Sequence, residues 1–264
     1  MSGTGGHDKI FRLLKVMVAF FPVVFMCYVL YTRFADYAFY QWAFMKEDGP
    51  VEWLTFIAYL PASLIALFIA MDLKKENRVY GNLYFILAAG LFVICMEEIS
   101  WGQRIFGIGT PSFFMSHNRQ HEMNMHNMLA GSYVHFLYIL TGLYGMLSRV
   151  FFRKLFGLKK TTERYLFTPD VFLALYFFMV FAFYFYWDFI SPLEKSFWGE
   201  YVLRGRFIDA KLQEPAEFIQ AAGFLFFLSM NRYRQKKGVF SAAGQLHPLR
   251  ADASEEKPGA GVIS

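Results

Sequence analysis

Two adjacent glutamates stand in the segment of the chain that is richest in groups able to do chemistry. Glu97 and Glu98 end an apolar run and are followed closely by Trp101, Gln103 and Arg104. Ionisable side chains at the end of such a run are costly to bury, and this cost indicates function. If the helix continues, Glu97, Trp101 and Arg104 share one face and Glu98 points about 100° away. We therefore expect Glu98 to act as a general base, with Glu97 and Arg104 as catalytic partners. The alternative is a structural ion pair between Glu97 and Arg104.

Metal-ligating side chains follow a short way along the chain. On a helix His117 and His121 lie one turn apart, as do Glu122 and His126, and such pairs hold the ion in helical zinc sites. Imidazole with carboxylate suits zinc, iron or manganese. We expect a divalent metal such as zinc, held by His121, Glu122, His126 and, from the next apolar run, His135. The alternatives are histidines that bond to backbone in an interfacial loop and, for His135, an interhelical hydrogen bond.

Two apolar runs begin in the same way, with proline, a glutamate two positions later and then an aromatic residue. The glutamates are Glu52 and Glu217. Helix capping alone explains this likeness. The alternative is that both converge with the glutamate pair in one acidic cavity, and Gln213, Glu217 and Gln220 do fall on one helical face. The expected substrate-binding residues are Glu52, Trp101, Gln103, Asn127 and Glu217.

The segment that begins with the glutamate pair resembles the CPBP group of intramembrane proteases, relatives of the CAAX-processing enzyme. That family has Glu-Glu-x-x-x-Arg on a helix and two later histidine motifs. Here Glu97 and Glu98 match the pair, and Arg104 follows Glu98 by six positions rather than four. The resemblance implies that the glutamates and one later histidine activate a water molecule that attacks a peptide bond.

The amino-acid composition of the chain limits the class of protein that holds these chemical groups. The chain has 264 residues, of which 56% are apolar, 20% aromatic and 18% charged, whereas soluble domains average about 25% charged residues. Such hydrophobicity excludes disorder, and two cysteines cannot form a disulfide framework. We expect an all-α polytopic membrane protein with about six transmembrane helices. The apolar stretches are Leu13–Tyr31, Val51–Met71, Tyr80–Met96, Met128–Phe151, Pro169–Trp187 and Pro215–Met230.

Basic residues predict the orientation of these spans. Of the 26 Lys and Arg residues, 18 lie in the two termini and in the loops on the same side of the membrane as the termini. That side is expected to be cytoplasmic, in a bacterial-type plasma membrane. The net charge of +5 is then a topology signal and needs no nucleic acid partner. The expected parts are a cytoplasmic N-terminus (1–12), a membrane domain (13–230) and a disordered cytoplasmic tail (231–264).

Three functions remain after these observations. The first is a membrane-embedded hydrolase or transferase with an outward-facing Glu/His site, acting on a lipid, a lipid-linked compound or a peptide. The second is a small transporter or a cation- or lipid-binding protein, in which the outer acids hold a cation. The third is an assembly partner whose aromatic loops bind another membrane protein. Membrane lipid is the one partner expected in every case.

Overall fold

The computed structural model describes residues 4–46, 49–103, 105–118, 121–125, 128, 131–155, 161–201, 203 and 212–238. Every regular element within this part of the chain is helical. The long helices are α1 (Thr4–Ala35), α3 (Pro50–Glu76), α4 (Arg78–Glu98), α6 (Gly131–Leu155), α8 (Ala174–Phe185) and α11 (Gln213–Lys236). The shorter elements are α2 (Tyr37–Tyr40), η1 (Gln41–Met45), η2 (Ser100–Gly102), α5 (Ser112–His117), α7 (Thr161–Phe167), η3 (Val171–Leu173), η4 (Tyr186–Ile190) and α9 (Ser191–Trp198).

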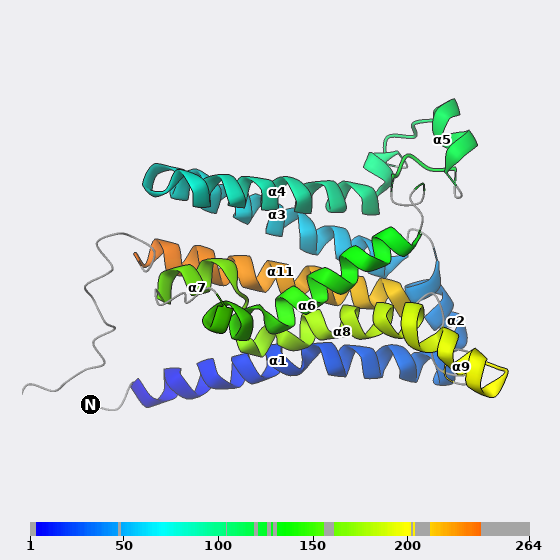
Figure 1. Ribbon diagram of the computed structural model, residues 1–264, viewed down its shortest axis with the longest axis horizontal. Coiled ribbons are helices and arrows are strands. Elements are labelled where there is room, and N and C mark those ends of the chain that lie inside the picture. The colour runs from blue at the N-terminus through cyan, green and yellow to red at the C-terminus, as the bar shows by residue number, and fades with distance from the viewer. Residues whose placement is uncertain are drawn as a thin grey trace, which may run out of the picture.

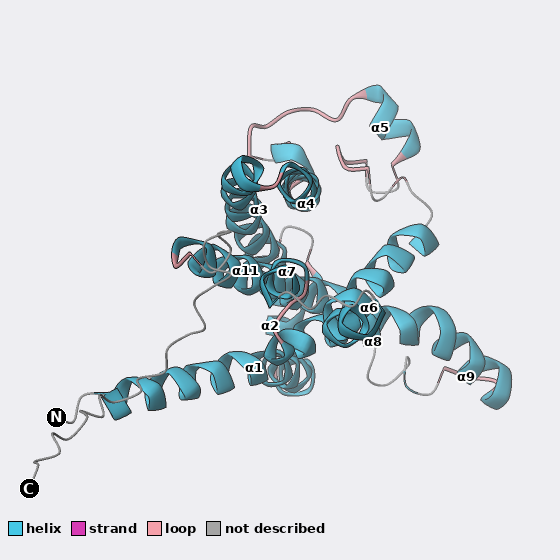
Figure 2. Ribbon diagram, turned by 60° about the vertical axis from the view of Figure 1, so that its left-hand side comes forward, coloured by secondary structure: helices cyan, strands magenta, loops and turns pink. Residues whose placement is uncertain are grey.

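The long helices form a bundle in which α11 is the central element. Helix α11 packs against α3 on one side and against α8 on the other, α4 packs on the outside of α3, and α6 packs on α8 (Figures 1 and 2). Elements α2, α5 and α9 gather at one end of the bundle (Figure 1, right), and α7 lies at the opposite end. The last turn of α4 and the first turns of α6 and α11 therefore all lie at the end of the bundle that carries α2 and α5.

Small residues allow the close contact between α6 and α8. A Cβ atom added at Gly145 would lie 2.0 Å from Cγ of Phe177, and one added at Gly142 would lie 2.6 Å from Cβ of Phe181. Helices in membranes associate through such close packing, because lipid supplies no hydrophobic drive between them.

Five helical stretches in the described part of the chain are long and apolar enough to cross a membrane. They are Leu13–Ala35, Tyr37–Glu76 (of which residues 47 and 48 lie outside the described part), Arg78–Glu98, Gly131–Phe151 and Arg164–Trp198. Large apolar side chains are exposed along their outer faces, as at Leu13, Met17 and Val24 of α1, while Thr55 and Ser63 of α3 are buried. Apolar surface outside and polar groups inside fit a multi-pass integral membrane protein, as the composition predicted.

The sixth expected span corresponds to α11, which is not among those five. Its position in the bundle accounts for this difference. Glu217, Gln220 and Asn231 lie on α11 and are buried against neighbouring helices. A helix shielded from lipid by protein can carry polar side chains that a lipid-facing helix cannot.

Two expected boundaries fall inside helices. Helix α1 begins at Thr4, within the segment 1–12, and α11 continues to Lys236, beyond residue 230. The expected tail lies outside the described residues from residue 239 onward.

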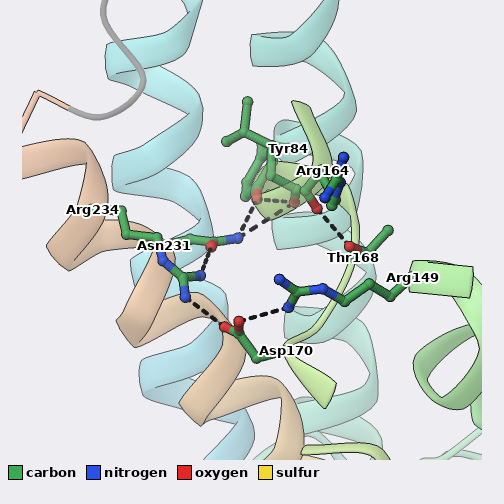
Figure 3. Close-up of polar contacts among 8 residues, drawn as sticks. Tyr84, Arg149, Arg164, Thr168, Asp170, Asn231 and Arg234 are labelled. Atoms are coloured by element: carbon green, nitrogen blue, oxygen red, sulfur yellow. Dashed lines mark hydrogen bonds and ion pairs between the residues drawn. The ribbon is translucent and has the colours of Figure 1, made fainter. Parts of the chain in front are cut away.

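A polar network ties the helices together at the end of the bundle near α7 (Figure 3). Asp170 accepts from Arg149 of α6 over 2.7 Å and from Arg234 of α11 over 2.6 Å. Tyr84 of α4 donates to the carbonyl of Leu166 over 2.6 Å. Asn231 of α11 also donates to the hydroxyl of Tyr84 over 3.0 Å. Four helices (α4, α6, α7 and α11) and the segment before η3 are thus fixed relative to one another by buried or half-buried polar contacts.

Candidate carboxylate site

Three glutamates meet where α4 ends and α11 begins. Carboxylate oxygens of Glu98, Glu214 and Glu217 all lie within 4.8 Å of one another. Glu98 and Glu214 are half-buried, and Glu217 is 7% exposed. These three residues are called the carboxylate cluster below. Within the described residues, this is the one group of three or more His, Cys, Asp or Glu side chains with the spacing of a metal site.

The start of α11 explains the position of two of these carboxylates. Pro215 lies in the first turn, where its missing N–H breaks no hydrogen bond. Glu214 and Glu217 are three residues apart, so their side chains lie on the same face of the helix. Both are near the helix N-terminus, whose dipole stabilises negative charge. The first turns of α11 therefore present two carboxylates to the end of α4.

Aromatic and imidazole side chains line one side of the cluster. Tyr184 of α8 donates a hydrogen bond to Oε1 of Glu217. Its ring stacks on Tyr138 of α6 with centroids 4.7 Å apart, and the ring of His135 lies at the same centroid distance. Nδ1 of His135 is 2.8 Å from Oδ1 of Asp188 in the π-helical turn η4. This confirms the simpler expectation for His135, an interhelical hydrogen bond.

A buried glutamine lies one turn further along α11. Oε1 of Gln220 accepts from the hydroxyl of Tyr59 over 3.2 Å. Gln220 is 1% exposed, and its Nε2 has no hydrogen-bond partner among the described residues. Tyr59 is near enough to Glu98 and Glu217 for their charges to act on its hydroxyl. A buried donor without a partner costs about 1–3 kcal/mol, so this amide is available to a ligand.

Glu97 has a different role from Glu98. Oε1 of Glu97 accepts from the indole N–H of Trp101 over 2.6 Å, and Oε2 accepts from the backbone N–H of Met125 over 2.5 Å. Among the described residues no hydrogen bond to the Glu98 carboxylate is found. The two adjacent glutamates thus point to different surroundings, as their helical spacing predicts. Glu97 fixes the loop, and Glu98 joins the cluster.

Helix α4 does not continue toward Arg104, which corrects the assumption of a single helical face. The helix ends at Glu98, and Ser100 and Trp101 have φ values of 45° and 56°. Left-handed backbone at non-glycine residues is strained and persists where surrounding contacts enforce it. Here Ser100 donates to Glu122 over 2.6 Å. Arg104 itself lies outside the described residues.

The loop after α4 uses several residues expected at the site as structural contacts. Nε2 of Gln103 donates to Thr110, and its Oε1 accepts from the backbone of Met123. Nδ1 of His121 lies 2.8 Å from the carbonyl of Met115. Among the described residues, neither His121, Glu122 nor His135 belongs to a group with metal-site spacing. The predicted positions His126 and Asn127 lie outside the described residues.

Of the remaining expected residues, Glu217 belongs to the carboxylate cluster and Glu52 lies near it. Glu52 is half-buried in the first turn of α3, near enough for its charge to act on both Glu98 and Glu217. The alternative, in which these glutamates converge in one acidic cavity, is therefore supported for Glu98 and Glu217, which share the carboxylate cluster. Glu214 was not among the expected site residues, although its spacing of three from Glu217 is visible in the sequence.

No protein family, curated protein or solved structure gives a significant match to the chain. The resemblance to CPBP proteases therefore stays a prediction.

Proposed function

We propose that this integral membrane protein is a membrane-embedded hydrolase or transferase that acts on a lipid or lipid-linked substrate at the carboxylate cluster. One observation carries the proposal: oxygens of Glu98, Glu214 and Glu217 come within 4.8 Å of one another on two helices of the bundle. Three carboxylates at this separation repel one another unless protons or a cation neutralise them. Carboxylates are kept in such a costly arrangement where they have a function.

A hard divalent cation fits this set of donors. Carboxylate oxygens without imidazole or thiolate suit Mg²⁺, Mn²⁺ or Ca²⁺, whereas zinc was the metal expected with histidine ligands. Glu214 and Glu217 would hold the ion, with Glu98 at its edge. A bound cation of this kind would supply Lewis-acid polarisation of a phosphoryl or carbonyl oxygen.

The side chains around the cluster fit distinct roles. Tyr184 holds one oxygen of Glu217, so the remaining oxygen is oriented. Glu98 lacks such a fixed donor among the described residues and is the group best able to accept a proton from water or from a substrate hydroxyl. The amide Nε2 of Gln220 is a donor suited to an ester or phosphoester oxygen.

A cation carrier is the second candidate, because buried polar side chains occur near both ends of α11, at Glu217 and at Asn231. Buried Phe224 and Phe227 separate them. An apolar segment in the middle of the central helix disfavours a continuous ion path, so the enzyme is the better-supported candidate.

The cation part of the proposal is tested by measuring Mn²⁺ and Mg²⁺ binding to the purified full chain by calorimetry. Glu217→Gln is expected to lose binding, because it removes a charged ligand, and Glu98→Gln is expected to weaken binding, because it removes a neighbouring negative charge. Glu76→Gln is the matched control, since Glu76 is exposed at the other end of α3. Uptake by proteoliposomes, measured with the same ions, separates the carrier from the enzyme.

The enzymatic part is tested by mass spectrometry of lipid extracts. Cells that lack the protein, or that carry Glu98→Gln, are expected to accumulate the same lipid species, while cells with Glu76→Gln resemble the wild type. The proposal fails if the purified chain binds neither ion and Glu98→Gln leaves the lipid profile of the wild type unchanged.

A further inference from the structure

An apolar groove opens between α4 and α6, away from the carboxylate cluster along the bundle. Its volume is about 430 Å³, within the range of about 300–1,000 Å³ that is common for ligand sites. Leu83 and Leu87 of α4 line one wall and Leu140 of α6 lines the other. Phe224 and Phe227 of α11 lie at its base and are buried. Figures 1 and 2 show that α4 and α6 belong to separate helix pairs, α3 with α4 and α6 with α8.

The surroundings of this groove indicate what enters it. Both walls belong to helices that are candidate membrane spans, and Leu83 and Leu140 are exposed at the rim. The medium that meets this rim is therefore lipid hydrocarbon rather than water. An acyl or isoprenoid chain is the occupant whose chemistry matches apolar walls that face the bilayer.

The groove and the carboxylate cluster lie on the same side of α11. Glu217 and Phe224 are seven residues apart, two helical turns or about 10 Å. Gln220 lies between them, with its unpartnered amide Nε2 buried. The order along α11 is thus carboxylate, amide donor and aromatic floor. This order matches the order of parts in a membrane lipid: head group, ester or phosphoester linkage and chain.

We propose that the groove between α4 and α6 receives the hydrocarbon chain of the substrate lipid from the bilayer, while Gln220 binds its linkage oxygen and the carboxylate cluster binds its head group. This inference rests on the proposed function and adds the substrate class and the route of entry. The substrate is a lipid with a chain long enough to reach Phe224 and Phe227 from the cluster.

Photolabelling tests whether the groove holds a lipid chain. The full-length protein is reconstituted in phosphatidylcholine vesicles that contain a phosphatidylglycerol with a diazirine near the end of one acyl chain. Buried Phe224 and Phe227 are expected to be labelled, because a chain reaches them through the groove. Lipid around the protein will also label the exposed face of α1, which serves as the internal reference in every sample.

Two variants that fill the groove make this test specific. Leu87→Trp and Leu140→Trp are expected to lose the label on α11 and to keep the label on α1. The matched controls are Ile86→Trp and Leu137→Trp, on the same helices, because these residues are 69% and 60% exposed and do not line the groove. Having one filling variant on each wall protects the test against the failure of either variant to fold.

The outcomes separate this inference from the proposed function. The groove does not bind a lipid chain if the label on α11 equals background, or if that label persists in both filling variants. This conclusion holds even if cation binding is normal. Label on α11 that persists in Glu98→Gln, while cation binding is weakened, supports the groove. If that variant also keeps the wild-type lipid profile, the groove stands and the proposed reaction at the cluster fails.

Discussion

The hydroxyl of Tyr184 on α8 donates a hydrogen bond to Oε1 of Glu217 on α11, and so joins two helices at the carboxylate cluster. Tyr184 is buried, stacks on Tyr138 and contacts the ring of His135. Because the tyrosine is fixed by rings from α6, it holds the orientation of the Glu217 carboxylate. The contact thus connects the packing of three helices with the site at which we propose chemistry.

Removal of this hydroxyl tests the contact directly. Tyr184→Phe keeps the ring and removes one of the two tyrosine hydroxyls that donate to the buried Glu217 carboxylate, the other being that of Tyr138. This loss is expected to lower stability by about 1–3 kcal/mol. The measurement is the midpoint of thermal unfolding in detergent, followed by circular dichroism. Tyr133→Phe is the control, because Tyr133 on α6 is 69% exposed. Equal midpoints for the two variants would contradict a stabilising role for the hydrogen bond.

The sequence predicted the helical class and most spans because length and hydropathy alone decide whether a segment can cross a bilayer. It did not indicate which helix is central. Helix α11 has polar residues at Glu217, Gln220 and Asn231, and its burial depends on contacts with α3 and α8. Such contacts are made by residues distant in sequence, so local composition makes α11 look like the weakest span rather than the centre of the bundle.

The site was predicted in part, for a related reason. Glu98 and Glu217 could be found because carboxylates at the ends of apolar runs are conspicuous, and their helical spacing separates Glu98 from Glu97. The loop after α4 could not be predicted, because its course depends on left-handed backbone at Ser100 and Trp101. Those conformations are maintained by side-chain contacts across the loop, which no periodicity in the sequence reveals.

The contact between α6 and α8 gives a second test, of helix packing. Gly142→Ala adds a Cβ 2.6 Å from Cβ of Phe181 and 2.9 Å from the carbonyl oxygen of Phe177. Backbone cannot move away as a flexible side chain can, so overpacking is expected to cost about 1–3 kcal/mol. Gly90→Ala on α4 is the control, because its added Cβ meets no atom within 4 Å. In that control the higher helix propensity of alanine is expected to stabilise α4 by up to about 1 kcal/mol.

These glycine variants are compared by the fraction that remains folded in detergent over a temperature series. Opposite signs for Gly142→Ala and Gly90→Ala are the expected result. A neutral Gly142→Ala would mean that α6 and α8 are further apart than the structure shows.

The network in Figure 3 provides a third test at the opposite end of the bundle. Asp170 pairs with Arg149 over 2.7 Å and with Arg234 over 2.6 Å. Asp170→Asn removes the negative charge and leaves these two half-buried guanidinium groups without a carboxylate partner at this position. Breaking such a pair is expected to cost about 3 kcal/mol. Asp72→Asn is the control: its side chain also pairs with an arginine, Arg232, but is 41% exposed. Exposed pairs contribute about 0–1 kcal/mol.

The readout is the yield of monodisperse protein and the unfolding midpoint of each aspartate variant. A loss at Asp170→Asn that does not exceed the loss at Asp72→Asn would show that the network contributes no more than a surface ion pair.

Proton competition at the carboxylate cluster gives the fourth test. A carboxylate must be ionised to bind Mn²⁺, so binding releases any protons that Glu98, Glu214 and Glu217 share, and affinity is expected to fall as the pH falls. Each proton released changes the dissociation constant by about tenfold per pH unit. Calorimetric titrations with Mn²⁺ between about pH 5 and about pH 8 measure this slope. Because the three oxygens lie within 4.8 Å of one another, loss of one charge removes its repulsion of the other two carboxylates, which then bind fewer protons in the absence of the ion. Glu214→Gln should therefore weaken binding and also make the pH dependence shallower, whereas Glu76→Gln should change neither. An affinity that is independent of pH would mean that Mn²⁺ binds elsewhere.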